Sequence, residues 1–179
     1  MKLEGMKVVY LVAPGFEDLE FWVPVMRLQE EGARVTIAGL EAGAVYQGKG
    51  GLEATSDVGL SQVDPQWYDA VCIPGGWAPD KLRRYDTVKR LVKTLYDQQK
   101  TIGMICHAGW VGISAGIVKG HDATGSEAIK DDLVNAGATW RDESAFRSGC
   151  LVWGRVVADI PNYCRELVLA LEEQKARVK

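Results

Sequence analysis

Histidine is scarce in this sequence. Only His107 and His121 occur among 179 residues, together with four cysteines. No two cysteines have the C-x-x-C spacing of a structural zinc site, so we expect no bound zinc. The glycines at 48–51 match neither a Walker loop nor a G-x-G-x-x-G segment after a strand, which argues against a nucleotide. The sequence therefore predicts a protein without a cofactor.

An excess of charge of one sign is also missing. Lysine and arginine contribute 21 residues against 24 acidic ones, a formal net charge of -3, which creates no field that attracts nucleic acid or an anionic membrane. No stretch approaches the roughly 20 apolar residues that span a bilayer. The first five residues lead into patterned sequence without the apolar core of a signal peptide. We therefore expect a cytoplasmic protein that binds neither nucleic acid nor membranes.

The four cysteines are predicted to be free thiols. A chain of this length can form a hydrophobic core without disulfides, and no export signal directs it to an oxidising compartment. Cys72 lies inside an apolar strand and Cys164 lies on the apolar stripe of a helix, so both are assigned to the core. Cys150, beside a predicted hairpin turn, is uninformative.

Alternating strand and helix patterns predict a three-layer α/β sandwich with a largely parallel sheet, formed by one domain over 1–179. Apolar runs predict strands at 7–13, 34–38, 70–74 and 101–105. Helices are expected at 16–31 with a bend at Pro24, around 88–95, at 106–116 and 128–135, and from Asp159, a predicted cap, onward. A hairpin should flank 148–149, the segment 41–56 is a loop or a small hairpin, and 175–179 should be a frayed tail.

Three strand ends carry unusual polar or glycine-rich sequence, at 14–20, 74–80 and 106–107. The carboxyl ends of parallel strands share one edge of a sheet, where α/β proteins place their sites. We therefore expect these three segments to converge there.

Cys106 is placed where a buried strand turns into a helix, with Gly103 before it and Gly109 after it. Such an elbow exposes one side chain beside the positive end of a helix, which can lower the pKa of a thiol and make it a nucleophile. A small buried core cysteine is the other interpretation, and position alone does not separate the two.

His107 is the available base, although adjacent residues on a helix do not face each other. At an elbow it could reach the thiol if an acid oriented its ring, and Asp80 is the candidate. The simpler interpretation of Asp80 is a surface or capping carboxylate on the following helix. His121, in a polar turn, is expected to be a surface residue.

Glu20 stands between apolar neighbours at the front of the first helix, whereas Glu17 and Asp18 are explained by capping. A buried, protonated Glu20 could donate a hydrogen bond to sulfur or move a proton. Backbone N–H groups of Gly75, Gly76 and His107 could form an oxyanion hole.

Five ordered blocks, which cover nearly the whole chain, resemble the ThiJ/PfpI (DJ-type) superfamily and most of all its PfpI branch. They read APGFEDLE at 13–20, IPGGWAPD at 73–80, ICHAG at 105–109, IKDDLVNAGA at 129–138 and RVVADIP at 155–161. The resemblance implies a flavodoxin-like fold, a nucleophile at Cys106, a contacting carboxylate at Glu20 and the adjoining His107. It further implies a homodimer or larger oligomer in which the position of Asp80 orients the histidine from a neighbouring subunit, although aspartate has a shorter reach than the family's glutamate.

Two departures from the resemblance concern the pocket. Gly125 and Ser126 stand where relatives commonly carry a tyrosine or histidine, and Ser126 is expected to change the size or polarity of the pocket. Trp110 follows the elbow where relatives often have proline or glutamine, and together with Trp77 it could place two indoles at the mouth.

The resemblance implies an enzyme that acts on small carbonyl compounds, as a glutathione-independent glyoxalase or a deglycase, with Cys106 attacking the carbonyl. A cysteine peptidase that uses Cys106, His107 and Asp80 on a peptide substrate is the alternative. A non-enzymatic thiol redox sensor or stress-linked holdase is a third hypothesis.

Overall fold

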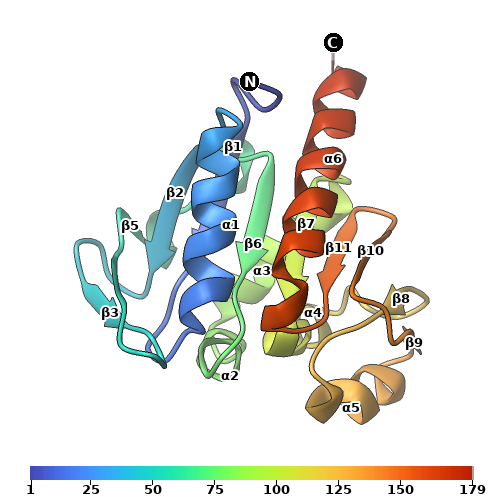
Figure 1. Cartoon of the computed structure of the whole chain (residues 1–179). Helices are drawn as coiled ribbons and strands as arrows, with labels where there is room; N and C mark the ends of the chain where they lie inside the picture. Colours follow the sequence, from blue (N-terminus) through green and yellow to red (C-terminus); the bar gives the residue numbers. More distant parts are fainter. Residues whose placement is uncertain (179) are drawn as a thin grey trace.

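A seven-stranded sheet forms the centre of the computed structural model, which describes residues 1–178 (Figure 1). The strand order is β10–β11–β7–β6–β1–β2–β5, and all neighbours are parallel except β10 and β11. The strands are β1 (Lys7–Leu11), β2 (Arg34–Gly39), β5 (Val58–Gly59), β6 (Ala70–Ile73), β7 (Thr101–Ile105), β10 (Ala145–Ser148) and β11 (Leu151–Gly154). The predicted α/β class with a largely parallel sheet is thus confirmed.

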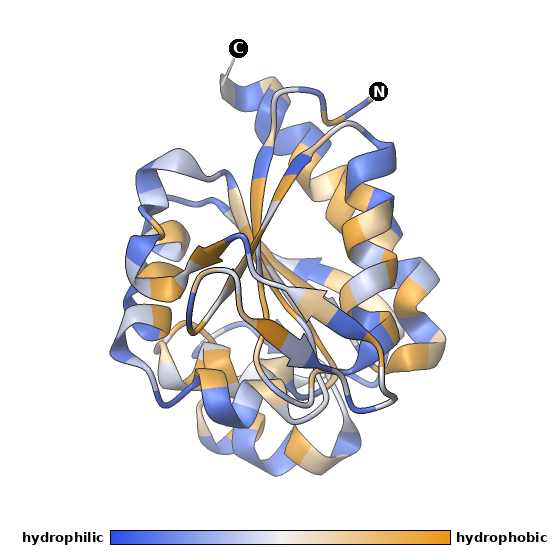
Figure 2. Ribbon diagram, turned by 90° about the vertical axis from the view of Figure 1, so that its left-hand side faces the viewer, coloured by the Kyte–Doolittle hydropathy of each residue, from blue (hydrophilic) through white to orange (hydrophobic). Residues whose placement is uncertain are grey.

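Helices cover both faces of this sheet. In Figure 1, α1 (Asp18–Glu30) and α6 (Ile160–Val178) lie on the near face, while α3 (Asp86–Asp97) packs against the far side. The shorter helices are α2 (Ala78–Leu82), α4 (Gly109–Ser114) and α5 (Lys130–Asn135), and the 3₁₀ turns are η1 (Leu60–Gln62), η2 (Pro65–Trp67), η3 (Cys106–Ala108), η4 (Glu127–Ile129) and η5 (Val157–Asp159). Figure 2 shows the hydrophobic segments gathered along the central strands between the two helical layers.

The central strands are apolar because they are buried on both faces. Every residue of β6 and β7 is buried, as are four of the five residues of β1. The four strands predicted from apolar runs are confirmed as β1, β2, β6 and β7. The two-residue strand β5 was not predicted, because so short a segment shows no periodicity.

The other strand pairs are short. The segment 41–56 forms the hairpin of β3 (Val45–Gln47) and β4 (Glu53–Thr55), the second of its two interpretations. β10 and β11 are the hairpin predicted around 148–149. A short parallel pair, β8 (Asp122–Ala123) and β9 (Thr139–Trp140), was not predicted.

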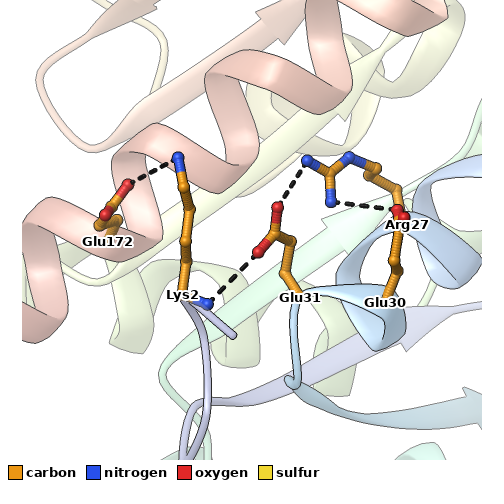
Figure 3. Close-up of polar contacts among 5 residues, drawn as sticks. All are labelled: Lys2, Arg27, Glu30, Glu31 and Glu172. Atoms are coloured by element: carbon orange, nitrogen blue, oxygen red, sulfur yellow. Dashed lines mark hydrogen bonds and ion pairs between the residues drawn. The ribbon is translucent and has the colours of Figure 1, made fainter.

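The amino-terminal segment is tied to the ends of α1 and α6, as Figure 3 shows. The Lys2 ammonium pairs with Glu172 at 3.4 Å, and the Lys2 backbone N–H donates to Glu31, which also pairs with Arg27 at 2.6 Å. Exposed pairs of this kind contribute little individually, but they fix where three segments meet.

Two expectations for α6 are wrong. The helix continues through Val178, so residues 175–178 are helical rather than frayed, while Lys179 lies outside the described residues. Asp159 directly precedes α6, but its two carboxylate oxygens accept hydrogen bonds from the Arg155 side chain at 2.9 and 3.2 Å instead of capping. Within the described residues, no helix combines the length and apolarity needed to cross a bilayer.

The cysteines are free thiols, as predicted. Cys72 and Cys164 are buried members of the hydrophobic core, which confirms their assignment. Cys150 and Cys106 are half-buried at the margin of the core.

Candidate active site

The three strand-end segments converge, as predicted, at the carboxyl edge of the sheet, the lower edge in Figure 1. They surround an open cavity of about 680 Å³. Its lining consists of Glu17, Glu20, Lys49, Gly76, Trp77, Asp80, Lys81, Cys106, His107, Trp110, Val156, Val157 and Ala158. The cavity is therefore lined by residues of α1, α2, η3, α4, η5 and the β3–β4 hairpin.

Cys106 follows β7 in the left-handed backbone region, with φ at +61°. This conformation is uncommon for a residue with a side chain and is the mark of a sharp strand-to-helix elbow. The backbone around it is close-packed, since Ser126 N–H donates to the Cys106 carbonyl at 3.1 Å and a side chain on Gly125 would overlap that carbonyl. The predicted elbow is confirmed.

Glu20 is completely buried in the first turn of α1. Its Oε2 accepts a hydrogen bond from the Gly75 N–H at 2.8 Å, and its own carbonyl accepts one from the Tyr10 hydroxyl at 2.7 Å. Burial, with a smaller contribution from the charge of Glu17, raises the pKa of Glu20 to about 7. Glu20 can therefore both give and take a proton near neutral pH.

The pKa of the Cys106 thiol is raised, not lowered as the elbow position suggested. Burial is the largest cause and the neighbouring Glu20 is the second, while the backbone N–H groups of His107 and Gly76 act in the opposite direction. Two negative charges in contact are unfavourable in a buried site, so the Cys106–Glu20 pair retains at least one proton at neutral pH. Sulfur becomes a thiolate when that proton moves to Glu20 or to another base.

His107 lies within reach of the sulfur and is the candidate for that other base. Its Nδ1 lies 3.2 Å from Cys106 Sγ, a contact that the turn at Cys106 makes possible for adjacent residues. Burial, and to a smaller extent the charge of Lys49, lowers the pKa of His107. The imidazole is therefore neutral at pH 7 and able to accept a proton.

The expected oxyanion hole is smaller than predicted. The Gly75 N–H is used by Glu20, so the assignment of Gly75 to the hole is wrong. The backbone N–H groups of Gly76 and His107 lower the pKa of the Cys106 thiol, so they lie near its sulfur and stay candidates for stabilising the oxygen of a carbonyl attacked there. Gly76 has φ at +73°, and a side chain there would clash with the backbone of 15–17.

Asp80 lines the cavity, but its carboxylate pairs with Arg84 at 2.6 Å. Within one chain it therefore behaves as an exposed partner of Arg84, inside α2 rather than as a cap. Among the described residues, Cys106 is the one hydrogen-bond partner of the His107 ring. The role of Asp80 across a subunit interface stays a prediction.

The two predicted indoles do lie at the cavity. Trp77 is 59% exposed, and Lys49 approaches its ring at 5.9 Å. Trp110 packs edge-to-face against His107, with ring centroids 5.2 Å apart. Ser126 does not line the cavity, so its placement in the pocket is wrong. Its N–H donates to the Cys106 carbonyl, and its hydroxyl accepts from Ala128 N–H as the cap of η4.

Sequence reasoning missed Lys49, Lys81 and the segment 156–158, which also line the cavity. The tip of the β3–β4 hairpin is anchored by Asp18, whose carboxylate accepts from Gly50 N–H at 2.5 Å and Leu52 N–H at 2.7 Å. A side chain on Gly48 would collide with that carboxylate, which explains glycine beside Lys49. The sequence feature that could have indicated Lys49 was a lysine flanked by glycines.

His121 is not a simple surface residue. Its Nε2 is 2.8 Å from the Tyr96 hydroxyl and its Nδ1 is 3.0 Å from the Ser148 hydroxyl. It joins α3 to the β10–β11 turn, away from the cavity. Across residues 1–178 no group of three His, Cys, Asp or Glu side chains is arranged to hold a metal ion.

The fold and the site define an α/β protein with a cysteine on a strand-to-helix elbow, in contact with a histidine and beside a buried glutamate. The chain belongs to the DJ-1/PfpI family, whose family model matches residues 6–170.

Three known proteins illustrate the relationship. Deglycase PH1704 of Pyrococcus horikoshii is 38% identical over 167 residues, which cover 93% of this chain and 100% of the relative. Putative cysteine protease YraA of Bacillus subtilis is 38% identical over 160 residues, 89% of this chain and 95% of the relative. A two-domain crystal structure from Anabaena variabilis, with DJ-1/ThiJ/PfpI-like and ferritin-like domains, matches with a TM-score of 0.91 and 34% identity over 93% of this chain and 48% of its own.

This chain therefore spans about half of the two-domain Anabaena protein and nearly the full length of the two relatives. The names of those relatives support an enzyme of the DJ-1/PfpI family.

Proposed function

We propose that this protein is a cytoplasmic, cysteine-dependent enzyme that acts on reactive carbonyls, of the glutathione-independent glyoxalase or the deglycase type. One observation carries the proposal: Cys106, on an elbow with φ at +61°, has its sulfur 3.2 Å from Nδ1 of His107. The buried Glu20, with a pKa of about 7, supplies a second proton carrier at the same sulfur.

The reaction begins when sulfur bonds to the aldehyde carbon of an α-oxoaldehyde while the thiol proton passes to His107 or Glu20. The carbonyl electron pair moves to oxygen, where the Gly76 and His107 N–H groups stabilise the charge. Removal of the proton on the attacked carbon and reprotonation at the neighbouring carbon pass through an enediol to a thioester. Water then cleaves the carbon–sulfur bond and releases a hydroxy acid and the thiol.

The cavity supports an adduct as substrate as well as a free oxoaldehyde. Its volume of about 680 Å³ lies in the range of pockets for much larger ligands than a three-carbon aldehyde. The additional space, bordered by Trp77 and Trp110, suits the amine-bearing part of a glycated side chain.

The test is conversion of methylglyoxal, free and as an adduct with an amino acid, to lactate. Cys106→Ser should abolish conversion, whereas Cys150→Ser, at a half-buried cysteine beside the β10–β11 turn, should retain it. A Cys106→Ser protein that converts methylglyoxal at the wild-type rate would contradict the proposal.

A cysteine peptidase is the second candidate, favoured by the presence of an acid, Asp80, in the same cavity as Cys106 and His107. It requires self-association in a homodimer or larger oligomer, in which Asp80 of one copy reaches His107 of another. Cleavage of an unstructured protein should then depend on oligomerisation and disappear in Asp80→Ala. The hypothesis of a thiol redox sensor stays a prediction.

A further inference from the structure

His107 can act on Cys106 only if its ring is held in one orientation. The χ2 torsion of a histidine has broad, roughly two-fold preferences, so the ring turns unless neighbours fix it. In catalytic triads a carboxylate does this. Here Asp80 is paired with Arg84 at 2.6 Å, and another group must hold the ring within a single chain.

Trp110 is in position to do so. It lies three residues after His107, a spacing that places side chains side by side on a helical turn. The two rings have centroids 5.2 Å apart and an interplanar angle of 67°, an edge-to-face arrangement. An aromatic neighbour in this geometry favours one plane of the imidazole over the others.

The indole is itself fixed from two sides. Its Nε1–H donates to Oδ2 of Asp132, on α5, at 2.8 Å. The Arg83 guanidinium lies 5.6 Å from the indole centroid, and Arg83 Nε donates to the Ser114 hydroxyl at 2.9 Å. A hydrogen bond to a carboxylate is stronger than one between neutral groups and sets direction as well as distance.

We propose that Trp110, clamped by Asp132, is the positioning residue that holds the His107 ring against the Cys106 sulfur within a single chain. This inference rests on the proposed function for its effect on turnover, but the orientation itself can be measured without a carbonyl substrate. An indole carries no net charge, so it orients the imidazole with a smaller effect on its pKa than a carboxylate, which raises the pKa of a histidine. The low pKa of His107 agrees with this arrangement.

The experiment measures the rate of Cys106 alkylation by iodoacetamide against pH, the His107 pKa by NMR, and kcat and KM for a methylglyoxal adduct. Trp110→Phe retains an aromatic ring but loses the N–H, and Asp132→Ala removes the acceptor. Both should slow alkylation and lower kcat by about tenfold, because a displaced ring misplaces the base. KM should be unchanged in Asp132→Ala, because Asp132 does not line the cavity. Asp132→Asn, which keeps an acceptor oxygen, should restore most of both rates.

Matched controls are Trp67→Phe, at an exposed tryptophan of η2, and Asp131→Ala, at the exposed neighbour of Asp132 on α5. Both should behave as wild type. Wild-type alkylation rates in Trp110→Phe and Asp132→Ala would overturn the inference. So would an Asp80→Asn variant that slows alkylation as much as Asp132→Ala and lowers the His107 pKa, because the carboxylate would then be the orienting group. If alkylation falls as expected but the wild-type protein converts no methylglyoxal species, the positioning role stands and the proposed function fails.

Discussion

The Gly75 N–H and the Glu20 carboxylate are joined by a 2.8 Å hydrogen bond at a point where a side chain on residue 75 would overlap Glu20 Oε2 and lie 2.8 Å from Cys106 Cβ. The end of β6 thus fits between the acid and the thiol. The backbone of Gly75 sets the separation of these two groups and supplies the donor that orients Glu20.

Gly75→Ala should therefore damage the site more than the fold. The added methyl group must push Glu20 or Cys106 away, which should lower kcat by about a hundredfold. Overpacking of this kind should cost about 1–3 kcal/mol in the free energy of unfolding. Gly59→Ala is the matched control, because its Cβ would meet its nearest neighbour at an ordinary 3.4 Å. Steady-state kinetics and urea denaturation check both variants, and normal kcat in Gly75→Ala would contradict this account.

The raised pKa of Glu20 makes stability depend on pH. Between its ordinary 4.5 and about 7, folded Glu20 keeps a proton that the unfolded chain has released. The contribution of Glu20 to stability is therefore greatest below this window and falls as the pH rises through it, by up to about 3 kcal/mol. Glu20→Gln should abolish this dependence and be more stable than wild type at pH 8, with loss of activity.

Denaturation midpoints at pH 5 and pH 8 measure this effect. Glu53→Gln, at an exposed glutamate of β4, should keep the wild-type dependence. A difference in stability between pH 5 and pH 8 that is the same in wild type and in Glu20→Gln would show that Glu20 ionises normally.

The left-handed backbone of Cys106 predicts an inverted glycine effect. Glycine is ordinarily less stable than alanine in a folded chain, but at φ +61° alanine retains the clash that glycine avoids. Cys106→Gly should therefore be more stable than Cys106→Ala by about 1 kcal/mol, although both are inactive. Ala108→Gly, where φ is -60°, should show the ordinary destabilisation. Thermal denaturation of the wild type and the three variants measures these differences in stability. A Cys106→Gly protein that is less stable than Cys106→Ala would argue against backbone strain at this position.

The charge of Lys49 should shift the pH dependence of the reaction rate. Its positive charge lowers the pKa of both Glu20 and His107. In Lys49→Gln both pKa values should rise, so the acidic limb of the rate profile, where His107 becomes protonated, should move to higher pH. Lys93→Gln, at a lysine paired with Asp97 on α3, is the control. An unshifted limb in Lys49→Gln would exclude an electrostatic role for this residue.

Most of the fold could be predicted because its determinants are local. Apolar β-branched runs defined the buried strands, and the segments at 14–20, 74–80 and 106–107 met where a parallel sheet requires. The short strands β5, β8 and β9 could not be predicted, because two residues carry no periodicity and depend on contacts from elsewhere.

In the site, too, local features could be predicted and features that depend on tertiary contacts could not. Cys106, His107 and Glu20 were recognisable from their places at strand and helix ends. The direction of the Cys106 pKa shift was not, because burial and the contact with Glu20 join residues 86 positions apart and outweigh the local N–H groups. Likewise, Gly75 and Ser126 were misassigned because the partners of their polar groups are set by tertiary packing.

The anchoring of the β3–β4 hairpin by Asp18 has a consequence for altering substrate choice. The hairpin tip delivers Lys49 to the cavity but contributes nothing to the elbow, and it is attached to α1 through backbone N–H groups that any sequence compatible with the turn would retain. Residue 49 is thus a position at which the reach of the rim can be redesigned without moving the backbone at the strand ends, whereas a change of its charge would also shift the pKa values of Glu20 and His107.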